Sequence, residues 1–214
     1  MKEACGHEAR LSSWYFFMMR ETIAMKKTQV TRMVIAAVLL AVGMMLPRFL
    51  GGVQVLGQTI SPLHIPALIA GLTLGGAWGC VVGALIPLLS SLLGMPPLPI
   101  ALPMAFECAA YGLLAGLLYP ALRRALKKDN HLPAILIALV IAMVGGRLVG
   151  GAAKALLLTF GAITSKAPFT MAAFISSYFV GTAVGAVIHL IVVPAVVLAL
   201  EKAKLSPAAQ AVRA

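Results

Sequence analysis

Charged residues are scarce in this chain, and acidic ones are the scarcest. Only 11% of the 214 residues are Asp, Glu, Lys or Arg, against about 25% in soluble globular domains. Aromatic residues make up 7% of the chain and hydrophobic residues 61%. A soluble core of this size does not need so much apolar surface. The composition therefore excludes an ordinary soluble domain and favours one domain embedded in a membrane.

Cysteine is also rare, with only Cys5, Cys80 and Cys108 and no CxxC pair. A disulfide framework and a cysteine-based zinc site are thereby excluded. The chain also lacks GxSxG, HExxH and Walker A motifs and shows no carboxylate pair. We therefore predict no catalytic residues, no metal and no cofactor. If the chain takes part in active transport, another subunit must supply the energy.

The net charge is +11, from 17 Lys and Arg against 6 Asp and Glu. In a soluble protein, such an excess would suggest nucleic acid as a partner. Here the basic residues cluster between apolar blocks, with no stripe of aromatic residues beside them. We therefore expect a lipid bilayer as the partner, and no nucleic acid, because basic clusters between apolar helices set membrane orientation.

Residues 1–24 differ from the rest of the chain. Their apolar stretch, 14–19, is too short for a signal-peptide core or a transmembrane helix. A short basic segment then begins at Met25, directly before the first long apolar block. We interpret 1–24 as an N-terminal extension that is not ordered or not native, and Met25 as the native start.

Gly, Pro and charged residues divide the remainder into six apolar blocks. A spanning helix needs about 20 mostly apolar residues, and the stretch 49–106, without Asp, Glu, Lys or Arg, holds two such helices with their loops. We expect turns at 51–62, 75–79 and 94–103, where Gly and Pro cluster. The first block is 34–47, two blocks lie between these turns, and the last three are 104–122, 132–160 and 172–200. The sixth is long enough to tilt or to bend near Pro194.

Basic residues in the short loops predict the orientation. With six spans, both termini lie on one side, which would hold nine Lys and Arg residues, whereas the other side would hold only Arg48 and Lys166. We therefore predict an all-α bundle of six transmembrane helices with both termini in the cytoplasm. Residues 25–200 would form this membrane domain, in the cell membrane, and 201–214 a cytoplasmic tail.

Small residues recur at four-residue spacing within the predicted helices. They are Gly71, Gly75, Gly79 and Gly83, then Gly112 and Gly116, Gly146 and Gly150, and Gly181 and Gly185. Lipid offers no hydrophobic drive for helices to associate, so close backbone packing must supply it. We predict that these rows pack the helices against each other.

Glu107, Arg147 and Lys154 are ionisable residues inside predicted helices. Each costs roughly 2.5 kcal/mol or more in lipid, so such groups face a protein interior or a wet cavity. Glu107 lies one turn from the outer end of its helix, Lys154 about two turns from the outer end of the next, and Arg147 two turns deeper on nearly the same face. We predict one cavity open to the outside. A structural ion pair that only fixes helix packing is the alternative.

Two cations against one carboxylate leave an excess of positive charge, which favours an anionic ligand. Lys154 is the expected contact of a ligand carboxylate. Arg147 would pair with Glu107 or bind the deeper end of the ligand.

Three further polar residues lie inside the helices or at their ends. His64 opens the second helix at the outer surface, where it could close over a ligand or simply begin the helix. Tyr111 is one turn below Glu107 on the same face and could contact a small ring or serve packing. We expect His189 near the inner end of the last helix, as an interfacial histidine far from the cavity.

Several stretches carry a resemblance to a known family. They are VIAAVLLA at 34–41, LHIP at 63–66, PMAFE at 103–107 with YGL at 111–113, and Gly146-Arg147. With the six-span layout, they make residues 25–200 resemble the S components of energy-coupling factor (ECF) transporters, the membrane subunits that capture vitamins in prokaryotes.

The resemblance implies a pocket for one small molecule near the outer face, under the loops after spans one, three and five, where Glu107, Arg147 and Lys154 fall. It also implies docking onto a transmembrane coupling subunit joined to two ATPase subunits. The family's docking face carries an AxxxA motif on the first helix, which Ala37 and Ala41 match. The whole subunit would tip over in the membrane to release its ligand inside.

The substrate does not follow from the resemblance. Pantothenate is one candidate anion, and a riboflavin-like or other vitamin precursor remains open. A small intramembrane enzyme using Glu107 or His189 as acid or base is an alternative, although no second catalytic group is evident. A stand-alone carrier is another, although carriers usually show internal repeat halves and none is evident here.

Overall fold

The structure is a computed structural model that describes residues 28–49, 61–126, 131–164 and 168–208. The expected extension at 1–24, the start at Met25, most of the first loop and Lys166 lie outside the described residues. The chain divides into two compact units, Met1–Val34 and Ile35–Ala214. In the first unit the described residues, 28–34, are helical, and the helices named below belong to the second or continue into it.

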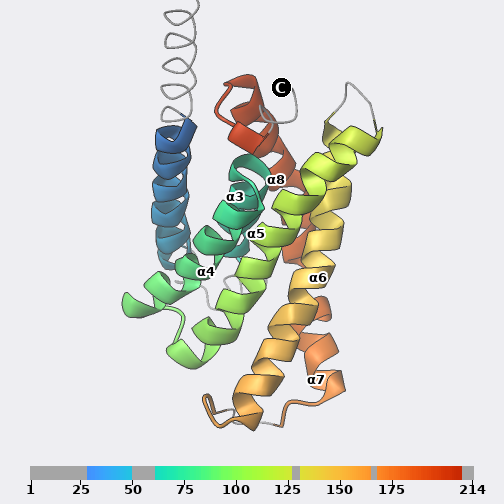
Figure 1. The fold of residues 1–214 in the computed structure, drawn as a ribbon. Helices are drawn as coiled ribbons and strands as arrows, with labels where there is room; N and C mark the ends of the chain where they lie inside the picture. Colours follow the sequence, from blue (N-terminus) through green and yellow to red (C-terminus); the bar gives the residue numbers. More distant parts are fainter. Residues whose placement is uncertain (1–27, 50–60, 127–130, 165–167, 209–214) are drawn as a thin grey trace, which may run out of the picture. The chain divides into compact units, whose positions relative to one another are not determined.

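Every regular element in the described part of the chain is a helix (Figure 1). The first helix is Thr28–Phe49, drawn in blue, and it is followed by α3 His64–Leu74, α4 Gly76–Leu92, α5 Leu98–Leu126, α6 Leu132–Thr159, α7 Met171–Ile175, the π-helix η1 Ser176–Val180 and α8 Ala183–Lys202. The prediction of an all-α membrane protein is confirmed.

Four stretches of helix are long and apolar enough to cross a membrane, namely Thr28–Phe49, α5, α6 and the composite Met171–Lys202. α3 and α4 are shorter, with 11 and 17 residues. Eleven helical residues rise only about 16 Å, roughly half the ~30 Å of a hydrocarbon core. Six separate full-length spans are therefore not seen, and the six-span count and the side of the termini stay predictions.

The turns differ from the expected positions in three places. The turn expected at 75–79 contracts to Gly75, whose φ of +99° favours glycine, and α4 begins directly afterwards. α5 begins at Leu98 rather than 104, with a proline in its first turn, where no backbone N–H is needed. The last helix is interrupted at 176–182, where η1 and a short turn precede α8, and not near Pro194, which lies inside α8. Only α6 closely matches its predicted range.

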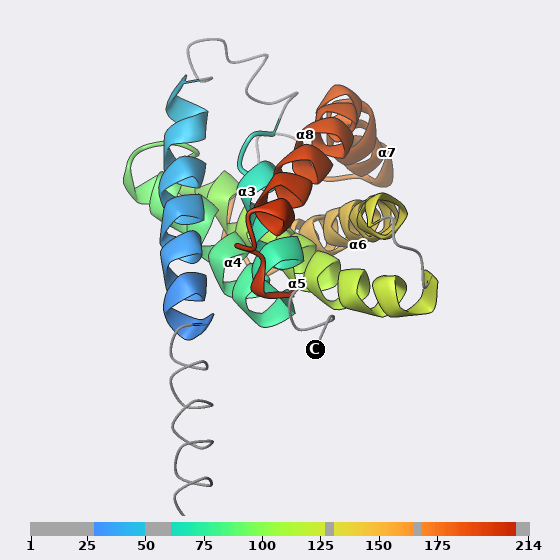
Figure 2. The same ribbon diagram turned by 90° about the horizontal axis from the view of Figure 1, so that it is seen from above.

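α3 lies at the centre of the packing. Almost all of its residues are buried, including Ala67, Leu68 and Leu72 at 0% exposure, and it packs against α4, α5 and α8. Figure 2 shows α3 with these three helices around it. A short uncharged helix can be buried on every side because its backbone hydrogen bonds are satisfied internally.

Glycines bring α3, α4 and α5 into backbone contact. A Cβ added at Gly71 would lie 2.3 Å from the carbonyl oxygen of Gly112, and one added at Gly112 would lie 2.1 Å from that of Gly79. Gly83 and Gly116 are equally close to the backbone of a neighbouring helix. These rows pack the bundle internally, as predicted, because only a residue without a side chain allows so close an approach.

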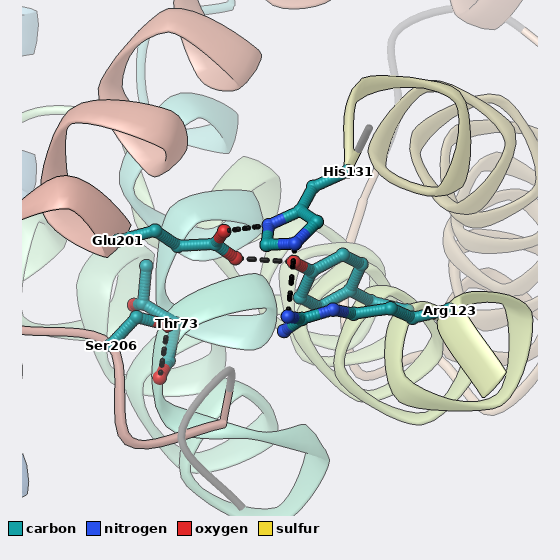
Figure 3. Close-up of polar contacts among 6 residues, drawn as sticks. Thr73, Arg123, His131, Glu201 and Ser206 are labelled. Atoms are coloured by element: carbon teal, nitrogen blue, oxygen red, sulfur yellow. Dashed lines mark hydrogen bonds and ion pairs between the residues drawn. The ribbon is translucent and has the colours of Figure 1, made fainter. Parts of the chain in front are cut away.

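A buried polar cluster ties the end of α8 to α5 and α6 (Figure 3). The carboxylate of Glu201 accepts hydrogen bonds from the Tyr119 hydroxyl and from His131 Nδ1, the latter at 2.5 Å, and Arg123 lies 3.0 Å from the other ring nitrogen of His131. The segment after α8 then turns back, and Ser206 donates to the carbonyl of Thr73 at 3.4 Å. The end of α3 remote from His64 is thereby covered.

Candidate functional site

A cavity of about 180 Å³ lies between the beginnings of α3 and α5, the second half of α6, and η1. We call it the polar cavity, and it is lined by Ser61, His64, Pro99, Ile100, Pro103, Met104, Glu107, Arg147, Lys154, Ser177, Tyr178 and Thr182. Ionisable side chains from three helices meet here, which is unusual inside a membrane domain and marks a candidate functional site.

Four of the five residues predicted to bind substrate line this cavity, namely His64, Glu107, Arg147 and Lys154. Tyr111 does not line it, but its hydroxyl donates a hydrogen bond of 2.6 Å to Glu107 Oε1. The structure therefore brings all five together, although their role in binding stays a prediction.

Two glycines of α6 make this meeting possible. A Cβ on Gly146 would lie 2.1 Å from the Tyr111 ring, and one on Gly150 would lie 2.7 Å from the Cβ of Glu107. α6 can therefore approach α5 closely beside these two side chains. Arg147 follows Gly146 directly in the chain, so the same close approach carries its guanidinium to the cavity.

Neither cation of the cavity has a direct carboxylate partner in the part of the chain that the structure describes. The two ion pairs found there within 4.0 Å are His64 with Glu107 at 3.7 Å and His131 with Glu201. The direct pair of Arg147 with Glu107, one of two options considered for Arg147, is not formed. Arg147 is nevertheless only 9% exposed and Glu107 only 6%.

Arg147 and Lys154 each contact an aromatic ring instead of a carboxylate. The Arg147 guanidinium lies 5.5 Å from the centre of the Phe179 ring, and the Lys154 ammonium lies 4.8 Å from that of Phe169. The face of an aromatic ring attracts a cation without neutralising it. Neither ring therefore supplies the negative charge that a carboxylate partner would.

His189 lies close to His64, which lines the cavity. Their ring centres are 6.0 Å apart, and His64 also packs edge-on against Tyr111 at 4.9 Å. His189 is 2% exposed. The expectation that His189 lies far from the cavity is therefore wrong. The reason is that α8 begins only at Ala183, after the interruption, so position 189 lies two turns from the start of α8, near the cavity-lining Thr182.

Five of the residues missed from the sequence come from the segment 169–182. Ser177, Tyr178 and Thr182 line the cavity, and Phe169 and Phe179 face its cations. Hydroxyl and aromatic side chains concentrated at the start of an otherwise aliphatic helix were an available signal. Their meaning depends on η1, and a π-helical turn inside a helix frequently marks a functional site.

The first helix presents two faces within the second unit. Ala36, Leu39 and Gly43 are buried, whereas Ala37 and Ala41 are exposed and lie one turn apart. The predicted docking pair thus belongs to the outward face.

In the described residues, no three His, Cys, Asp or Glu side chains lie close enough together to hold a metal ion.

The comparison with protein families gives one finding. The family described as "ECF transporter, substrate-specific component" matches residues 31–200. This range includes most of the first helix, all five residues predicted to bind substrate and most of α8. No curated protein and no solved structure matches the chain.

Proposed function

Because the chain belongs to the family of substrate-specific components of ECF transporters, a transport subunit of the membrane, we propose that it captures a small anionic molecule in the polar cavity. Capture would occur at the outer face of the cell membrane. Uptake would be driven by two ATPase subunits through a transmembrane coupling subunit. Pantothenate is the vitamin that we propose as the first ligand to test.

The observation that carries this proposal is the charge of the cavity wall. Arg147 and Lys154 both line the cavity, and each faces an aromatic ring at 5.5 Å and 4.8 Å instead of a carboxylate. A cation in low-dielectric surroundings needs an anion nearby. A ligand carboxylate would supply this anion. Arg147 and Lys154 are seven residues apart, which is about 10 Å along α6. We therefore place the carboxylate at Lys154, the more accessible of the two cations.

The cavity also fits a small ligand in size. Its volume of about 180 Å³ is below the roughly 300–1,000 Å³ of drug-sized pockets, which favours a compact, flexible molecule over a large planar ring system. A riboflavin-like ligand would require the walls to move apart.

Lys154→Ala tests the proposal, with Lys202→Ala as a matched control, because Lys202 is exposed at the end of α8 and does not line the cavity. Losing one charge-assisted hydrogen bond costs about 1.5–3 kcal/mol, so Lys154→Ala should weaken pantothenate binding by roughly tenfold to more than a hundredfold. Isothermal titration of the purified protein measures this.

Three results would count against the proposal. Unchanged affinity in Lys154→Ala would show that the charges are structural. An equal loss in Lys202→Ala would show that overall positive charge, not the cavity, attracts the ligand. Failure of the native protein to co-purify with a coupling subunit and ATPases would favour a stand-alone carrier or an intramembrane enzyme.

A further inference from the structure

Four hydroxyl groups in or beside the polar cavity donate their hydrogens to partners inside the protein. Each of these four oxygens is therefore left only as an acceptor. These bonds are Tyr111 to Glu107 at 2.6 Å, Ser177 to the carbonyl of Ala173 at 2.7 Å, Thr182 to the carbonyl of Tyr178 at 2.6 Å and Tyr178 to the carbonyl of Gly150 at 3.4 Å.

His64 brings an unpaired polar atom to the cavity. Its Nε2 is buried and has no hydrogen-bond partner in the described part of the chain. An imidazole nitrogen donates or accepts a hydrogen bond according to its tautomer. A hydroxyl group both donates and accepts, so it can pair with Nε2 in either tautomer.

Glu107 adds an acceptor beside it. Its described polar contacts, the hydroxyl of Tyr111 and the ring of His64, both involve Oε1, and no donor among the described residues reaches Oε2. His64 Nε2 lies 3.7 Å from Oε1, too far for a hydrogen bond. Buried polar atoms in proteins are nearly always paired, so a group from outside the chain is the expected partner of His64 Nε2, beside the open oxygen of Glu107.

Building on the proposed function, we infer that the ligand is bipolar. Its anionic end meets Lys154, and its other end carries hydroxyl or amide groups that fill the gap between His64 Nε2 and Glu107. Such a molecule is a hydroxy acid or an amide-bearing acid of small size. A carboxylate whose other end is apolar pairs with Lys154 alone and leaves His64 Nε2 without a partner.

Three probes of nearly equal shape test the contributions of the two ends of the ligand separately. Pantothenate has a carboxylate at one end and two hydroxyls at the other. 3,3-Dimethylbutanoyl-β-alanine keeps the carboxylate and replaces both hydroxyls by hydrogen. Pantothenol keeps the hydroxyls and replaces the carboxylate by a hydroxymethyl group. We expect the wild-type protein to bind pantothenate at least tenfold more tightly than either analogue, since each loses hydrogen bonds to a charged or buried group.

Variants assign each preference to its residues. His64→Phe keeps a ring against Tyr111 but removes Nε2, so the ratio of affinities for pantothenate and its dideoxy analogue should fall toward one. Lys154→Ala should leave that ratio unchanged and lower the preference for pantothenate over pantothenol. Glu107→Gln gives a second reading of the hydroxyl end if His64→Phe does not fold, as judged by elution profile and melting temperature.

The outcomes are distinct. Equal affinity of the wild-type protein for pantothenate and the dideoxy analogue overturns the hydroxyl-bearing end, because water then pairs with His64 Nε2. The proposal of an anionic ligand is not affected by that result. Equal affinity for pantothenate and pantothenol overturns the anionic ligand itself. A hydroxyl preference that survives in both His64→Phe and Glu107→Gln refutes the assignment to these residues. Binding of none of the three probes overturns this ligand class.

Discussion

Gly112→Ala should destabilise the bundle, although alanine is the better helix former. The new Cβ would lie 2.1 Å from the carbonyl oxygen and 2.9 Å from the Cα of Gly79, where contacts below 3.0 Å essentially do not occur. α4 and α5 would have to separate by about 1 Å. Overpacking of this kind costs about 1–3 kcal/mol, against a gain of at most about 1 kcal/mol in helix propensity. We expect a net loss of up to about 2 kcal/mol.

Gly145→Ala on α6 is the matched control. Its Cβ would meet only Cδ1 of Leu114, at 2.6 Å, and the end of a flexible side chain can move away. Both variants gain the same helix propensity, so their difference isolates backbone packing. Reversible unfolding in detergent measures the two free energies. If Gly112→Ala is as stable as Gly145→Ala, α4 and α5 do not make this backbone contact.

Two further predictions concern partners and topology. Ala37→Leu or Ala41→Leu should abolish co-purification with the coupling subunit and leave ligand binding intact, because both residues lie on the exposed face of the first helix. Loss of ligand binding with assembly intact would place them in the core instead. In intact cells, an impermeant maleimide should label Leu93→Cys, after α4, but reach Asn130→Cys only after permeabilisation, and the reverse pattern would invert the proposed orientation.

The composition, and the Gly, Pro and charged residues that separate the apolar blocks, were enough to predict much of the fold. The scarcity of charge and the run from 49 to 106 without Asp, Glu, Lys or Arg already indicated a helical membrane domain, because only helices satisfy their own backbone in lipid within so short a segment. The glycines of α3, α4, α5 and α6 were correctly interpreted as packing positions, except Gly75, which forms a turn, whereas the pair Gly181 and Gly185 stays a prediction. α6, bounded by charge on one side and Gly161 on the other, was predicted almost to the residue.

Helix lengths were harder to predict. A long uncharged run does not reveal where one helix ends inside it, so the shortness of α3 and the early start of α5 were missed. Both depend on partners: α3 can be short because α4, α5 and α8 surround it and Ser206 covers its end. No local pattern encodes these neighbours.

For the candidate site too, the sequence predicted some features and only the structure gave the others. The sequence alone identified Glu107, Arg147, Lys154 and His64, because an ionisable or polar residue in an apolar block is visible without a structure. Only the tertiary structure decided their partners. The interruption of the last helix at 176–182 brings Phe179 to Arg147 and His189 to His64, and the close approach of α6 at Gly146 and Gly150 decides which groups touch. Such distances depend on how closely the helix backbones pack, and the spacing of residues along the chain does not determine that packing.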